Sequence, residues 1–131
     1  MTDVNPESRA LGETRLIYKI LRPEEWSAFK MQEAFAGAPV DLADGYVHLS
    51  TAEQAPETAA RHFAGEEGLR LLAFDSAGFG DALRWEPSRG GALFPHLHAP
   101  LPRAAVVWDA PLPLGSDGRH LFPEGFGAPQ G

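Results

Sequence analysis

The sequence contains no cysteine among its 131 residues. This absence excludes a disulfide framework, a zinc site with thiolate ligands and a cysteine nucleophile. No apolar run approaches the ~20 residues that a membrane-spanning helix needs. The first residues also lack the basic-then-apolar order of a secretory signal. The sequence therefore predicts a cytoplasmic protein without a membrane segment.

Basic residues are scarce as well. The chain has 11 Lys and Arg against 18 Asp and Glu, so its net charge is 11 − 18 = −7. Broad binding to nucleic acid or to an anionic membrane needs a basic face, so we expect neither partner. A small basic pocket for one phosphate group remains compatible with this charge. Hydrophobic residues make up 44% of the chain, which suits one folded domain that acts as a monomer or small homo-oligomer.

The pattern of apolar residues predicts a single domain of the α+β class. A strand, a helix, a second strand and a second helix are followed by several strands, which favours one mostly antiparallel sheet. The expected helices span 24–35 and 56–63, with Trp26, Phe29, Ala59 and Phe63 facing inward. The expected strands span 15–21, 46–49, 69–74, 83–86 and 104–108, and the expected loops span 38–45 and 94–102. A flexible leader (1–13) and a flexible tail (124–131) flank the domain (14–123).

The segment around His48 is the first candidate site. Strand alternation places Tyr46, His48 and Ser50 on one face. Ser50 and Thr51 are each followed three residues later by Glu or Gln, which predicts a helix start. The N–H groups of that start suit a phosphate or carboxylate. The alternative is that His48 is a hydrogen-bonded core residue and that Ser50 and Thr51 only cap the helix.

Glu86 is the second candidate. It ends a predicted strand directly before Pro87, where a side chain can project into a cleft. Burial there raises the pKa of a carboxylate unless a positive charge offsets it, and Arg84 or Arg89 is the expected offset. Arg89 also precedes two glycines, on a segment able to fold over a ligand. The alternative is a surface salt bridge between Arg84 and Glu86.

The remaining candidates are His96, His98 and Lys19. Pro95 and Pro100 stiffen the loop that carries both histidines. A His-x-His pair can chelate a metal ion, but no carboxylate lies nearby in the loop, so we predict no structural metal site. The role of His98 stays open. Lys19 is a lone lysine in an apolar strand, which indicates either ammonium chemistry or an edge residue whose ammonium reaches solvent.

These segments together resemble a known family. IYKI, EEW, DGYVHLSTAEQ, RHF and LRWEPSRGGALFPHLHAPL are similar to the DUF952 family of small bacterial and plant proteins. That family in turn resembles the ADP-ribosyltransferase-like superfamily, including NAD-dependent tRNA 2′-phosphotransferases. The resemblance implies a split sheet that holds an ADP-ribose-containing ligand, with Glu86 orienting a ribose hydroxyl. Lys19 stands where the superfamily often has histidine, and His98 where DUF952 proteins usually have tyrosine.

These observations predict an enzyme that acts on a nucleotide-type ligand by glycosyl or phosphoryl-group transfer. The ligand would be NAD, ADP-ribose or a phosphorylated nucleoside; NAD is a candidate substrate, and no cofactor is assigned. We expect His48 and Glu86 to be catalytic and to face one cleft, with His96 at its wall. The expected ligand-binding residues are Lys19, Ser50, Thr51, Arg84, Arg89 and His96. The alternatives are a non-catalytic small-molecule sensor and a histidine-based metal hydrolase.

Overall fold

The structure, a computed structural model, describes residues 16–123 and 126. Within these residues the strands form three antiparallel sheets instead of the one that we predicted. The first has the order β1-β4-β8, the second β3-β6-β5, and β2 pairs with β7. Their bounds are β1 Leu16–Leu21, β2 Ala34–Phe35, β3 Val47–His48, β4 Leu69–Asp75, β5 Leu83–Ser88, β6 Ala92–Leu97, β7 Leu101–Pro102 and β8 Val106–Leu112.

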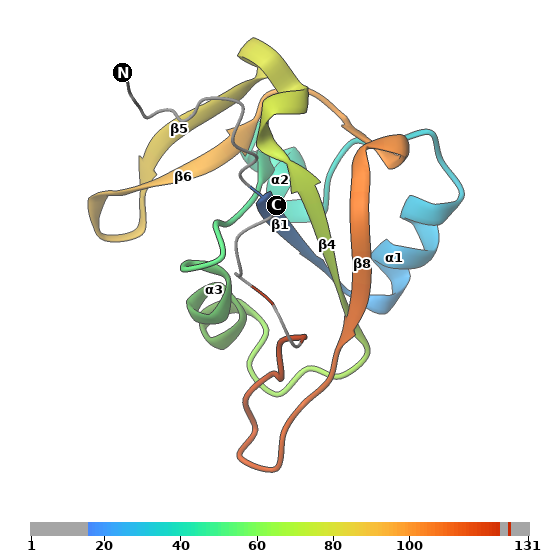
Figure 1. The fold of residues 1–131 in the computed structure, drawn as a ribbon, viewed down its shortest axis with the longest axis vertical. Coiled ribbons are helices and arrows are strands. Elements are labelled where there is room, and N and C mark those ends of the chain that lie inside the picture. Colours follow the sequence, from blue (N-terminus) through green and yellow to red (C-terminus); the bar gives the residue numbers. More distant parts are fainter. Residues whose placement is uncertain (1–15, 124–125, 127–131) are drawn as a thin grey trace.

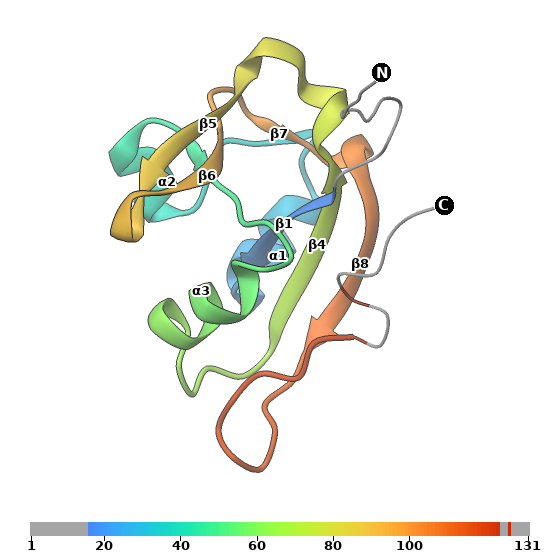
Figure 2. The same ribbon diagram turned by 60° about the vertical axis from the view of Figure 1, so that its left-hand side comes forward.

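Two helices cover the β1-β4-β8 sheet from opposite sides (Figure 1, Figure 2). Helix α1 (Pro23–Lys30) packs Phe29 on one face, and α3 (Ala55–His62) packs Ala59 on the other. The sheet residues alternate accordingly, because successive side chains of a strand point to opposite faces. Burial of both faces makes this sheet the centre of the core.

A backbone bridge connects this sheet to the segment that follows β3. Tyr18 and Ser50 exchange two hydrogen bonds, of 2.7 Å and 2.9 Å between nitrogen and oxygen. Thr51 and Gln54 then close the turn before α3: the Thr51 N–H donates to Gln54 Oε1, and the Gln54 N–H donates to Thr51 Oγ1. This reciprocal pair is the capping box that the sequence predicts.

The expected helix over 24–35 is too long. Helix α1 ends at Lys30, and residues 34–35 form β2 instead. Phe35 is buried there because its strand pairs with Leu101 on β7. A pairing between segments so far apart in sequence overrides the local helical pattern. The predicted inward orientation of the aromatic residues in this helix is confirmed, since Phe29 is buried and Trp26 is half-buried.

The two expected loops are also partly wrong. The first contains α2 (Pro39–Asp44), which starts with proline in its first turn and ends at Gly45 in a left-handed conformation (φ 89°). The second contains most of β6, the central strand of its sheet. Pro95 lacks an N–H and faces β3 just beyond the end of that strand, so no ladder hydrogen bond is lost there. The Pro95 carbonyl still accepts a hydrogen bond from the Leu49 N–H.

The predicted leader and most of the predicted tail lie outside the described residues. Phe126 is described, and its ring packs on Tyr18 with 4.8 Å between centroids. In the described part of the chain, no helix is long and apolar enough to cross a membrane.

Candidate functional site

A pocket of about 580 Å³ lies beside β1. The residues that line it belong mainly to β1, α2, α3 and the β5–β6 hairpin. Pockets of this size bind small molecules. Its polar lining includes Lys19, His48, Ser50, Thr58, Arg61 and His96.

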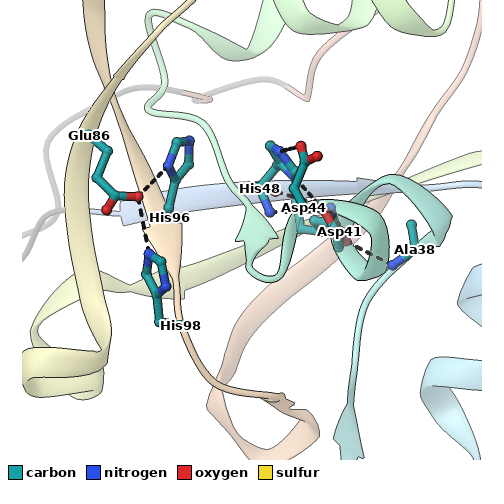
Figure 3. Close-up of polar contacts among 8 residues, drawn as sticks. Ala38, Asp41, Asp44, His48, Glu86, His96 and His98 are labelled. Carbon is teal, nitrogen blue, oxygen red and sulfur yellow. Dashed lines mark hydrogen bonds and ion pairs between the residues drawn. The ribbon is translucent and has the colours of Figure 1, made fainter.

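His48 contacts a carboxylate through each of its ring nitrogens. Nδ1 lies 2.6 Å from Asp41 Oδ1, and Nε2 lies 2.9 Å from Asp44 Oδ2 (Figure 3). The backbone N–H of His48 also donates to Asp41 Oδ1. The ring can donate to both carboxylates at once only when both nitrogens carry a proton. The two carboxylates therefore fix the orientation of the imidazole at the edge of the pocket.

Asp41 is the anchor of this arrangement. It is 1% exposed, and its Oδ2 accepts hydrogen bonds from Lys19 Nζ and from the Ala38 N–H, each at 2.8 Å. Burial by itself raises the pKa of this carboxyl. The hydrogen bonds from His48 and the charge of Lys19 outweigh burial, so the pKa lies far below its ordinary range. Asp41 is therefore a buried carboxylate.

Gly37 makes room for Asp41. Its φ is +135°, and a Cβ at this position would lie 2.5 Å from the Cβ of Asp41. Only glycine fits both the backbone conformation and the space. Gly37 and the first turn of α2 thus aim Asp41 at β1 and β3.

Lys19 closes the network from β1. Its ammonium donates to Asp41 and, at 3.0 Å, to the backbone carbonyl of His48. Burial lowers the pKa of Lys19, and the negative charge of Asp41 opposes that shift. The side chain is 6% exposed, so the alternative of an edge residue whose ammonium reaches solvent is wrong. Lys19 forms a buried ion pair that borders the pocket.

Glu86 binds two histidines through one oxygen. Its Oε1 lies 2.8 Å from His96 Nδ1 and 3.1 Å from His98 Nε2 (Figure 3). These hydrogen bonds, from His98 first and then from His96, lower the pKa of Glu86 despite its desolvation. We expected an arginine to offset the effect of burial on this carboxylate. The two imidazoles have that role instead.

His96 is buried, at 2% exposure, and lines the pocket. Its Nε2 makes no hydrogen bond within the part of the chain that the structure describes. Buried polar atoms nearly always have a partner, so an unpaired nitrogen at a pocket wall calls for an explanation. A ligand group in the pocket would supply the missing hydrogen-bond partner.

His48 and His96 lie next to each other on one face of the β3-β6-β5 sheet. His48 is the cross-strand neighbour of His96, and their ring centroids are 5.5 Å apart in an edge-on arrangement. The ring of Tyr46 packs against both of these rings and against His98, with centroid distances of 4.7, 4.3 and 5.1 Å. The Tyr46 ring therefore restrains all three imidazoles.

The structure thus brings together part of the predicted site. Four expected residues border the pocket: Lys19, His48, Ser50 and His96. Glu86 does not line it but contacts it through His96.

Of the other three predicted residues, Thr51 and Arg84 do not border the pocket. Thr51 closes the turn before α3 and does not line the pocket. Arg84 is exposed on β5 and lies outside the pocket lining. Arg89 lies in the turn that joins β5 to β6.

The sequence analysis did not identify Asp41 and Asp44 as parts of the site, and it placed Tyr46 on the face of His48 without giving it a role. Pro39 followed two residues later by Asp41 is a helix-start signal that would have placed α2. No local pattern reveals that Asp41 meets Lys19, 22 positions earlier in the chain.

No group of three His, Asp or Glu side chains within the described residues is arranged to hold a metal ion. Each of His48, His96 and His98 instead contacts a carboxylate.

The fold and site define a small α+β domain with two carboxylate-bound histidines beside one pocket. The family model described as "Protein of unknown function (DUF952)" matches residues 20–109. The chain belongs to this family. A search of curated proteins finds no match.

Solved structures of protein CC0527 from Caulobacter crescentus are similar to this chain. Its crystal structure has 53% sequence identity and a TM-score of 0.78, over 81% of this chain and 93% of that one. Its solution NMR structure has 54% identity and a TM-score of 0.73, over 79% and 90%. These comparisons support a single α+β domain with antiparallel sheets. They contain no ADP-ribosyltransferase, so that expected fold relationship stays a prediction.

Proposed function

We propose that this protein is an enzyme that transfers a phosphoryl group of a small nucleotide-type ligand by acid–base catalysis. One observation carries the proposal: His48 and His96 border the same pocket, and each has its Nδ1 bound to a carboxylate. A carboxylate at Nδ1 orients an imidazole and fixes the proton on that nitrogen. The Nε2 of His96 is then available for chemistry, and that of His48 becomes available when a ligand group replaces Asp44 as its partner.

The surroundings of the two rings suit different roles. His48 contacts Asp41 and Asp44 and can donate to both only when both of its nitrogens carry a proton, so we assign it the general acid. His96 contacts Glu86 at Nδ1 and has an unpaired Nε2 that can accept a proton, so we assign it the general base. Glu86 and Asp41 are positioning residues in this scheme, because each acts through its histidine.

In the proposed transfer step, a hydroxyl group of water or of the ligand attacks phosphorus. His96 Nε2 takes the proton of this hydroxyl as the new P–O bond forms. The P–O bond to the leaving group breaks, and His48 Nε2 gives that oxygen a proton. A pair of this kind contributes typically 10²–10⁴-fold per proton transfer. Asp44 is exposed and can move away from His48 as substrate enters.

The pocket lining favours an anionic ligand. Although the chain has a net charge of −7, the lining residues that the structure describes include Lys19, Arg22 and Arg61 and one acidic side chain, Asp44. The carboxylate partners of the three cations do not line the pocket. Phosphate groups are therefore a better match than neutral or cationic ligands.

Glycosyl transfer from NAD, which the resemblance to ADP-ribosyltransferases implies, is less well supported by the site. It needs a carboxylate that reaches the ribose, whereas Glu86 contacts His96 and His98 and does not line the pocket. Release of nicotinamide from NAD is the assay that separates glycosyl from phosphoryl transfer.

The test is turnover of a panel of phosphate esters by the full chain. The panel contains NAD, ADP-ribose and 2′-phosphorylated nucleotides, with phosphate and nicotinamide release as readouts. We expect phosphoryl release by the wild-type protein and its loss in His48→Gln and His96→Gln. His120→Gln is the matched control, because His120 contacts the Glu66 carbonyl and does not line the pocket. Binding without turnover would favour the sensor module, and turnover that survives both substitutions would contradict the proposal.

A further inference from the structure

The pocket has two walls with different chemistry. His48 and His96 come from β3 and β6, on the side of α2 and the β5–β6 hairpin. Arg61 comes from the last turn of α3, which forms the other wall. Arg22 joins Arg61 on this α3 wall, because its guanidinium lies over the ring of Phe63, 4.6 Å from the centroid.

Arg61 is positioned by α3 and keeps donors available. Its Nε donates to Glu57 Oε2 at 2.8 Å, one helical turn earlier. Its two terminal nitrogens make no hydrogen bond within the part of the chain that the structure describes. Arginine stays charged at every relevant pH, and its planar fork matches the oxygens of phosphate and carboxylate groups.

Arg22 is held more firmly than Arg61. Its Nε and Nη2 donate to the two carboxylate oxygens of Glu66, at 2.8 and 3.0 Å. This pairing fixes the guanidinium beside the end of α3. The α3 wall therefore presents one anchored and one more adaptable cation, and neither Glu57 nor Glu66 lines the pocket.

Ser50 and Thr58 connect the two walls, and both line the pocket. Ser50 lies two residues beyond His48, just after β3, and its Oγ is 3.0 Å from Thr58 Oγ1. Arg61 lies three residues beyond Thr58 on α3, so the two side chains are neighbours on one face of that helix.

We propose that the α3 wall is a second anion subsite, so that the pocket selects ligands with two anionic groups. This inference rests on the proposed function, which places the reacting phosphate at His48 and His96. The second anion binds Arg61, with Arg22 beside it. The ligand class is a nucleoside or sugar that carries phosphate groups at two separated positions.

The test compares adenosine 5′-monophosphate with adenosine 3′,5′-bisphosphate by calorimetric titration of the full chain. We expect the bisphosphate to bind roughly tenfold more tightly, as one added charge-assisted contact provides. Arg61→Gln should remove this preference by weakening binding of the bisphosphate about tenfold, and it should weaken binding of the monophosphate less. Arg103→Gln should retain it, because Arg103 is exposed, contacts the Lys30 carbonyl and does not line the pocket.

The outcomes separate this inference from the proposed function. Equal affinity for the two nucleotides, or a preference that survives Arg61→Gln, would overturn the second subsite. If His96→Gln nonetheless weakens binding of the monophosphate, the phosphate site at the histidines stands. Failure of the wild-type protein to bind either nucleotide would overturn both proposals.

Discussion

The imidazole of His48 is bound at Nδ1 by Asp41, and the same carboxylate accepts a hydrogen bond from Lys19. Three segments, β1, α2 and β3, thus meet at one buried anion. A charge removed from water is costly unless its partners are well placed. The fold around the pocket therefore depends on the same contacts that orient His48.

Asp41→Asn should destabilise the protein strongly. The substitution leaves the ammonium of Lys19 buried without its counter-charge, and breaking a buried pair in this way costs about 3–5 kcal/mol. Denaturant unfolding measures the change. Asp44→Asn is the matched control, since the Asp44 side chain is exposed and its loss should cost less than about 1 kcal/mol. Equal effects of the two substitutions would contradict a structural role for the buried pair.

Gly37→Ala should also destabilise, by roughly 1–3 kcal/mol or more. The new Cβ would collide with Asp41 and would stand on a backbone that alanine rarely adopts. Gly78→Ala serves as the control, because a Cβ there meets no atom within 4 Å. Thermal unfolding of both variants measures the change in stability. A Gly37→Ala protein as stable as Gly78→Ala would show that Asp41 does not need this space.

Stability should fall on acidification through loss of the Asp41 charge. The pKa of Asp41 is lower in the folded protein than in the unfolded chain, where a carboxyl titrates near ~3.9. The contribution of ionised Asp41 to the free energy of unfolding is therefore fully present above the unfolded pKa, and it is lost as the pH falls toward the folded pKa. Unfolding free energies measured from pH 6 down to pH 2 should decline more steeply for the wild type than for Asp41→Asn. Parallel curves for the two proteins would contradict the conclusion that protonation of Asp41 causes the loss of stability.

Glu86→Gln should lower turnover while leaving the fold intact. The amide keeps the shape of the side chain but removes the charge that holds the proton of His96 on Nδ1. We expect a fall in kcat of up to roughly 10²-fold with little change in KM. His98→Gln should change kcat far less, because His96 still contacts Glu86 in that variant. A larger loss in His98→Gln than in Glu86→Gln would show that His98 has the catalytic role.

The sequence predicts the local elements well and the long-range contacts poorly. Apolar runs and the Thr51–Gln54 capping box suffice to place β4 and α3. By contrast, Pro95 and the surrounding residues resemble a loop, and pairing with β3 and β5 makes this segment a strand.

The sequence likewise predicts individual residues of the site better than the long-range contacts between them. Composition and spacing mark His48 and His96 as candidates, but no local pattern shows that Asp41 anchors His48, because that contact requires α2 to pack against β3. Arg84 was expected in the cleft because it precedes Glu86 by two residues. It lies on the same sheet face but not in the pocket lining. Proximity in sequence was therefore a poor guide to which residues border the pocket.

The most direct test of the histidine pair is the side-chain ¹⁵N NMR spectrum of His96, assigned by comparison with His96→Gln. The structure predicts that the neutral ring carries its proton on Nδ1, facing Glu86, and that Nε2 is unprotonated. Titration with inorganic phosphate should shift the Nε2 resonance as an anion enters the pocket. A neutral ring protonated on Nε2, or a spectrum unchanged by phosphate, would contradict the claim that His96 is a base poised beside a phosphate site.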